Sequence, residues 1–97
     1  ARLYLSSNQI NDIGSLNKLN NLKELKLIDN QISDISVVKD LDNLVYISTA
    51  GNSITDITPL LEVEKLKRAL ISSKHDKNII KELRANGVNV DTIEVKY

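Results

Sequence analysis

The sequence predicts an α/β solenoid, in which short coils stack on one another and each coil adds one strand to a parallel sheet. Three observations predict this fold. The chain repeats itself every 22 residues, and residues 3–24 and 25–46 share ten identities in 22 aligned positions. Apolar residues two positions apart, such as Leu25 and Leu27, lie on one face of a short strand. The 97 residues include no Phe, Trp or Met, so Leu, Ile and Val must fill a narrow, regular interior.

Positions one repeat apart form apolar ladders along the chain. A single coil cannot bury its apolar edge alone, so the ladder residues are expected to face a shared interior as the coils stack. Thr49 stands where earlier copies have Leu5 and Leu27, and Ala69 also replaces a larger residue, so the interior is expected to narrow at the third and fourth coils. The ladders are Leu3, Leu25, Ile47 and Ala69; Leu16, Val38 and Leu60; Leu19, Leu41 and Val63; and Leu22, Leu44 and Leu66.

Residues 22–32 read LKELKLIDNQI, a pattern of the form L-x-x-L-x-L-x-x-N-x-I that resembles the leucine-rich repeat signature. The flanking residues 54–60, ITDITPL, look like the 22-residue repeat of bacterial internalins, and the resemblance covers roughly residues 3–73. It implies a leucine-rich repeat solenoid with the parallel sheet on the concave side and 3₁₀ or short helical turns on the convex side. It also implies a bacterial source and a parent that is often exposed on the surface or secreted. The expected location is therefore extracellular or the bacterial cell surface, with the cytoplasm as the alternative.

An Asn follows the strand in each copy, at residues 8, 30 and 52. The backbone turns away from the sheet at this point and leaves N–H and C=O groups unpaired in the interior. An Asn amide offers both donors and an acceptor. We therefore expect Asn8, Asn30 and Asn52 to form a column that satisfies these groups.

Three Asp residues, Asp12, Asp34 and Asp56, keep the same spacing and precede an Ile. We interpret them as caps of the short helical turns. A column of carboxylates also suggests a cation ladder, but Ca²⁺ needs six to eight oxygen ligands and one carboxylate per coil does not supply them. No metal site is therefore predicted.

The repeats are assigned to residues 1–73, about three and a half coils, and a C-terminal cap to residues 74–97. Lys74 falls where a fourth Asn would be, and a Lys offers only donors. Ser73-Lys-His-Asp76 fits a helix start, so a helix is expected at about 75–86 and ends at Gly87. Alternating Val88, Val90, Ile93 and Val95 then indicate a strand that joins the sheet edge.

The N-terminal end of the solenoid is expected to be open, because the chain enters in the middle of a repeat. An exposed apolar end of this kind favours a fragment of a longer parent. The alternative is self-association, in which two copies of the chain cover each other through their open ends.

Strand residues that lie between the ladder positions should face solvent on the concave side and align in columns across the coils. Exposed Tyr and aliphatic side chains beside Arg suit a protein interface. The alternative is that such residues merely fit a pleated surface. The candidate partner-binding residues are Tyr4, Glu24, Lys26, Ile28, Tyr46, Arg68 and Leu70.

Composition excludes most other functions. Thirteen basic and thirteen acidic residues give a net charge of zero, which argues against a nucleic-acid partner, and no stretch is apolar enough for membrane insertion. There is no Cys, and the single His75 stands beside Asp76 without a nucleophile motif. No catalytic or cofactor-binding residue is predicted. We expect a non-catalytic protein-binding module; the alternatives are a structural spacer in a larger bacterial surface protein, or a regulatory scaffold attached to a domain outside this stretch.

Overall fold

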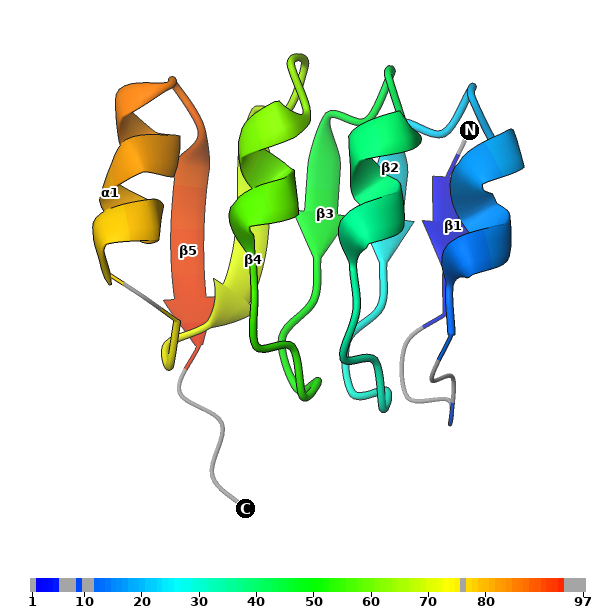
Figure 1. Cartoon of the computed structure of the whole chain (residues 1–97), viewed down its shortest axis with the longest axis horizontal. Coiled ribbons are helices and arrows are strands. Elements are labelled where there is room, and N and C mark those ends of the chain that lie inside the picture. Colours follow the sequence, from blue (N-terminus) through cyan, green and yellow to red (C-terminus); the bar gives the residue numbers. More distant parts are fainter. Residues whose placement is uncertain (1, 6–8, 10–11, 76, 94–97) are drawn as a thin grey trace.

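The computed structural model describes residues 2–5, 9, 12–75 and 77–93, and it contains a parallel sheet with the helical elements on one face (Figure 1). The strands lie side by side in chain order: β1 (Arg2–Tyr4), β2 (Glu24–Lys26), β3 (Tyr46–Ser48), β4 (Arg68–Ser72) and β5 (Asn89–Ile93). The 3₁₀ helices are η1 (Gly14–Lys18), η2 (Ser36–Asp40) and η3 (Thr58–Glu62), and they are followed by α1 (Lys77–Ala85). This arrangement confirms the predicted α/β solenoid.

The repeat length sets the register of the sheet. Leu25 lies opposite Leu3 and Ile47, and Ile47 lies opposite Ala69. Each of these residues is thus paired with the residue 22 positions away on the neighbouring strand. The step between β4 and β5 is one residue shorter, because Ala69 lies opposite Val90. This shorter spacing occurs where α1, rather than a 3₁₀ helix, connects the two strands.

A single apolar core runs between the sheet and the helices. Ladder residues of the second and third coils, such as Leu25, Leu44 and Ile47, are fully buried. Burial decreases at the first coil, where β1 forms one edge of the sheet, Leu3 is only partly buried and Leu19 is 43% exposed. The core therefore weakens toward β1, whereas it stays closely packed toward the C-terminal end, where Ile71 and Leu83 are fully buried.

The Asn column ties neighbouring coils together. The Nδ2 atom of Asn52 donates to the carbonyls of Leu27, at 2.7 Å in the preceding coil, and of Thr49, at 2.9 Å in its own. Its Oδ1 accepts a hydrogen bond from the Ile32 amide at 3.0 Å. Asn30 likewise donates to the Leu5 carbonyl at 2.7 Å. The predicted role is confirmed for Asn30 and Asn52, whereas Asn8 lies outside the described residues.

The Asp residues before the 3₁₀ helices hold the start of each turn. The Asp34 Oδ1 accepts the backbone N–H of Ser36 at 2.8 Å, and Asp12 and Asp56 make the same bond to the residue two positions on. This is an Asx turn that lies one residue before the cap position of the helix. The predicted capping role is confirmed, with the bond made by the residue that precedes the cap.

These bonds make acid stability depend on Asp34 and Asp56. The N–H groups of Ser36 and Thr58 hold the pKa of Asp34 and of Asp56 below the ordinary value of 3.8. A lowered pKa in the folded state contributes stability above the ordinary pKa, and this stability is lost as the pH falls through the folded value. Asn keeps the accepting oxygen but does not titrate. The Asp34→Asn, Asp56→Asn double variant should therefore lose less free energy of unfolding than the wild type as the pH falls from 5 to 2. Urea unfolding at a series of pH values measures this loss. An equal loss in the two proteins would show that these Asp residues do not set the acid sensitivity.

Thr49 interrupts the ladder of Leu5, Leu27 and Ile71 in the core. It is only 2% exposed, and its hydroxyl has no hydrogen-bond partner among the described residues. A buried hydroxyl without a partner lowers stability. The predicted narrowing at this coil is thus accompanied by an unsatisfied polar group.

Replacing Thr49 with Val is expected to raise the free energy of unfolding by about 1 kcal/mol, because Val has a similar shape and no hydroxyl. Chemical unfolding measures the change. Thr55→Val is the matched control, since Thr55 is exposed and its replacement should change little. A loss of stability for Thr49→Val would show that the hydroxyl is satisfied in solution.

The C-terminal helix is shorter than the predicted range of about 75–86. It begins at Lys77, and Ser73 lies too far before it to cap it. The interpretation of Ser73 as the helix start was wrong because β4 extends to Ser72 and the Ser73 N–H is held by the Ile93 carbonyl at 3.0 Å. Asp76 and Val95 lie outside the described residues. Gly87 ends the helix as predicted, with φ of 89° and the Val88 N–H bonded to the Leu83 carbonyl.

Candidate functional site

The concave face is the face of the sheet that points away from the helices. Along β2, Leu25 points into the core and is fully buried, while Glu24 and Lys26 point outward. The 22-residue register stacks these outward side chains in columns, so that Glu24 lies between Arg2 and Tyr46. Residues far apart in the chain are thereby brought together on one surface.

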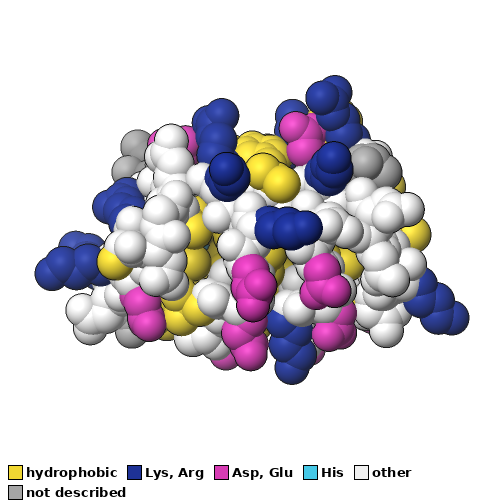
Figure 2. All heavy atoms as spheres, turned by 90° about the horizontal axis from the view of Figure 1, so that it is seen from above, with side chains coloured by type: hydrophobic (Ala, Val, Ile, Leu, Met, Phe, Trp, Pro, Cys, Tyr) yellow, Lys and Arg dark blue, Asp and Glu magenta, His cyan; other side chains and the backbone are white. Residues whose placement is uncertain are grey.

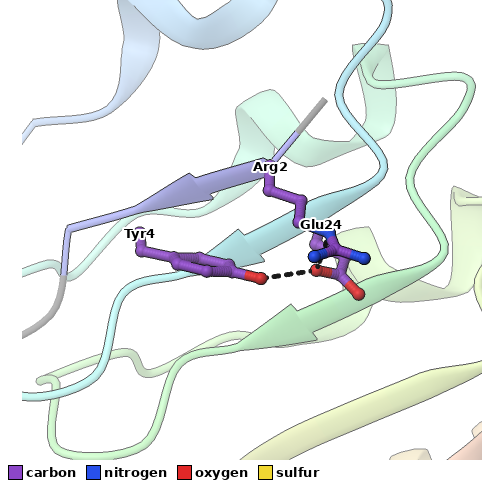
Figure 3. Close-up of polar contacts among 3 residues, drawn as sticks. All are labelled: Arg2, Tyr4 and Glu24. Carbon is purple, nitrogen blue, oxygen red and sulfur yellow. Dashed lines mark hydrogen bonds and ion pairs between the residues drawn. The ribbon is translucent and has the colours of Figure 1, made fainter.

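Arg2, Tyr4 and Glu24 form a polar cluster at the β1 end of this face (Figure 3). The Tyr4 hydroxyl donates to Oε2 of Glu24 at 2.7 Å, and Nε of Arg2 lies 3.0 Å from the same oxygen. The hydrogen bond from Tyr4, followed by the charge of Arg2, lowers the pKa of Glu24, and the same hydrogen bond raises the pKa of Tyr4. Glu24 is therefore held as a carboxylate, and Tyr4 stays neutral and fixed in orientation.

Aromatic rings and cations alternate across the face from β1 to β4. The Lys26 ammonium lies 4.6 Å from the centre of the Tyr4 ring and 5.8 Å from that of Tyr46. The Arg68 guanidinium lies 5.7 Å from the Tyr46 ring on the other side. Nη2 of Arg68 is 3.5 Å from a carboxylate oxygen of Asp91 on β5. These contacts order long side chains on the surface before any ligand is bound.

A shallow hollow of about 510 Å³ opens along this row of side chains. In Figure 2 the molecule is seen along the strands, with the sheet toward the top of the picture. Several Lys and Arg side chains gather at this upper margin, whereas Asp and Glu lie mainly toward the helices. The lining residues are Arg2, Tyr4, Glu24, Lys26, Val45, Tyr46, Lys67 and Arg68.

The hollow includes most of the candidate residues but not all of them. Ile28 and Leu70 are partly buried and do not line it, since Ile28 follows the end of β2 and Leu70 lies further along β4. The expectation that every column position is exposed was wrong for Ser48 and Ala50, which are buried. Both are small, and Ser48 lies in register between the larger Lys26 and Leu70.

Sequence reasoning did not select Arg2, Lys67 or Asp91 for this site. Arg2 occupies the same column as Glu24, and that column was the available signal. Lys67 precedes β4 rather than lying in it, so the strand pattern gave no indication of it. Asp91 is placed opposite Leu70 by the shorter step to β5, which the 22-residue period does not predict.

A second hollow, of about 300 Å³, lies at the other end of the strands and is lined in part by Ser72, Lys74 and His75. Burial lowers the pKa of His75. Over the described ranges, no group of three or more His, Cys, Asp or Glu side chains is placed to hold a metal ion. None of the helices that the structure describes is both long and apolar enough to cross a membrane.

Comparisons with known proteins agree on the repeat. The family model described as "Leucine Rich repeats (2 copies)" matches residues 2–40 and 21–62. An internalin (inlF) of Listeria monocytogenes is similar in structure, with a TM-score of 0.66 and 25% identity over 88% of this chain and 32% of its own. Internalin C2 (inlC2) of the same species has a TM-score of 0.68 and 33% identity over 93% of this chain. The chain spans 32% and 44% of the lengths of these two proteins. No curated protein gave a significant match.

Proposed function

Because the chain belongs to the leucine-rich repeat family, with 22-residue repeats of the bacterial internalin type, we propose that it is a non-catalytic module that binds a protein partner on its concave face. Leucine-rich repeat domains generally mediate protein–protein interaction. The similarity to internalins supports a location outside the cell or on the bacterial surface as part of the same proposal.

The observation that carries the proposal is the ordered row of Tyr4, Lys26, Tyr46 and Arg68 across the sheet. Tyr and Arg are the residues that most often dominate binding energy at protein interfaces. Here the rings and cations already contact one another, so part of the side-chain entropy is lost before a partner binds. Beneath Lys26, Tyr46 and Arg68, strands β2, β3 and β4 are anchored by the buried residues Leu25, Ile47 and Ala69, which hold this part of the surface in place.

Selective capture tests the proposal. The immobilised chain is exposed to host and bacterial protein extracts beside a Tyr46→Ala, Arg68→Ala variant and a Lys39→Gln control in η2, on the convex side. Each captured protein is then purified and titrated against the three chains by calorimetry. We expect a partner whose affinity falls at least about tenfold for the concave variant, a loss of about 1.4 kcal/mol, and is unchanged for the control.

The other outcomes separate the alternatives. If no captured protein depends on Tyr46 and Arg68, the concave-face proposal is wrong and a structural spacer is favoured. If binding is weakened by changes on the convex side instead, a scaffold that contacts another domain through its helices is favoured. Circular dichroism of each variant establishes that the fold is retained before binding is compared.

A further inference from the structure

The concave hollow carries an excess of positive charge that the chain does not neutralise. Its lining contains four basic residues and one acidic residue, although the whole chain is neutral. Glu24 is already engaged by Arg2 and Tyr4. Within the described residues, no carboxylate oxygen lies within ion-pair distance of the Lys26 or Lys67 ammonium groups. Neither ammonium group therefore forms an ion pair there, although Lys26 is near enough to Glu24 for its charge to help lower the pKa of that carboxyl group.

Arg2 and Arg68, the two arginines of the hollow, each contact a carboxylate group, which indicates the kind of group that the two lysines are able to bind. Arg2 binds the Glu24 carboxylate at 3.0 Å, and Arg68 lies 3.5 Å from that of Asp91. The Arg68–Asp91 pair is loosely held, because its two side chains are 60% and 55% exposed. An exposed pair of this kind contributes little to stability, so a partner carboxylate is able to displace Asp91 at small cost.

The rings beside the cations add an apolar component. Tyr4 is 50% exposed, and Lys26 lies over the rings of both Tyr4 and Tyr46. One side of the Lys26 ammonium faces these rings, which leaves its remaining N–H groups to bind an acceptor from outside. A ligand that places a carboxylate here brings its own chain into contact with the tyrosines.

From this arrangement we propose that the partner presents an acidic segment to the concave face, with Asp or Glu carboxylates bound by Lys26, Lys67 and Arg68. The inference rests on the proposed protein-binding function and specifies the chemistry of the partner. Charge complementarity of this type directs the encounter and selects among partners more than it increases affinity.

NMR titration of the ¹⁵N-labelled chain with two synthetic peptides tests the inference. In one peptide Glu alternates with Ser, and in the other Gln replaces every Glu. We expect the Glu peptide to shift amide signals of β2, β3 and β4, and to bind at least about tenfold more tightly than the Gln peptide. Raising the ionic strength from about 0.05 M to 0.3 M should weaken the binding, because the charges are exposed.

Substitutions of single lysines test whether the positive charges of the hollow bind the Glu peptide. Lys67→Gln should weaken binding of the Glu peptide about threefold or more, whereas Lys26→Arg keeps the charge and should retain binding. Lys39→Gln on the convex side is the matched control and should change nothing. Equal binding of the two peptides, absence of binding by the Glu peptide, or equal effects of Lys67→Gln and Lys39→Gln would each overturn the inference.

The inference and the proposed function fail in different ways. A captured partner that depends on Tyr46 and Arg68, but whose affinity is insensitive to Lys67→Gln and to salt, would leave the protein-binding function in place and remove its acidic character. Failure to capture any partner that depends on the concave face removes the proposed function itself, whatever the peptides do.

Discussion

Replacing Asn52 with Leu is expected to lower the free energy of unfolding by about 3 kcal/mol. The side chain donates to the Leu27 and Thr49 carbonyls and accepts from the Ile32 amide. The Leu27 carbonyl keeps a second donor in Asn30 at 3.1 Å. The Thr49 carbonyl and the Ile32 amide would each lose this partner, and Leu offers no polar group in its place at this partly buried position.

Chemical unfolding of the isolated chain measures this loss. Asn43→Leu is the control, because the Asn43 side chain also bonds the preceding coil, through the Asn20 carbonyl at 2.7 Å, but does so in an exposed contact. Water replaces the lost bond there, so this variant should lose well under half as much stability. Equal losses for the two variants would show that burial does not set the value of the Asn column.

Replacing Leu27 with Ala is expected to have a comparable or larger effect, a loss of about 2–5 kcal/mol, because the side chain is fully buried between two neighbouring coils. Leu5 provides a matched comparison: it has the same position in the repeat and lies in the first coil, where it is only partly buried. Leu5→Ala should therefore lose less than half as much, since water already reaches the site.

The same unfolding assay compares the two variants. If Leu5→Ala destabilises the chain as much as Leu27→Ala, the first coil is packed as tightly as the middle of the solenoid. The account of a core that weakens toward β1 would then be wrong.

Much of the fold follows from the period of the sequence. A strict 22-residue spacing fixes the register of β1 to β4, because each strand must present the same ladder residues to one interior. The polar roles of Asn30 and Asp34 follow from chemistry, since each occurs where the backbone turns and has groups to satisfy. The 22-residue period ends at Ser73. Beyond it the sequence predicted the start of the helix less accurately, and it did not predict the 21-residue spacing between paired positions of β4 and β5.

The candidate site was predictable only in part, for a related reason. Periodicity identifies which side chains share a face, and so it selected Tyr4, Lys26 and Tyr46. Periodicity does not predict the orientation that a long side chain takes on that surface. The contacts of Tyr4 and Arg2 with the same oxygen of Glu24 were therefore found only in the structure. Nor does periodicity predict that a small residue such as Ser48 is covered by larger neighbours.

Blocking one face at a time is the most direct test of the central claim, that a protein partner binds the concave face. The chain has no cysteine, so Lys26→Cys and Lys39→Cys each introduce a unique thiol for a bulky maleimide, on the concave and convex sides respectively. Affinity for the captured partner is then measured before and after labelling. We expect labelling at residue 26 to abolish binding and labelling at residue 39 to leave it unchanged. Binding that survives the label at residue 26 would show that the partner does not bind the concave face.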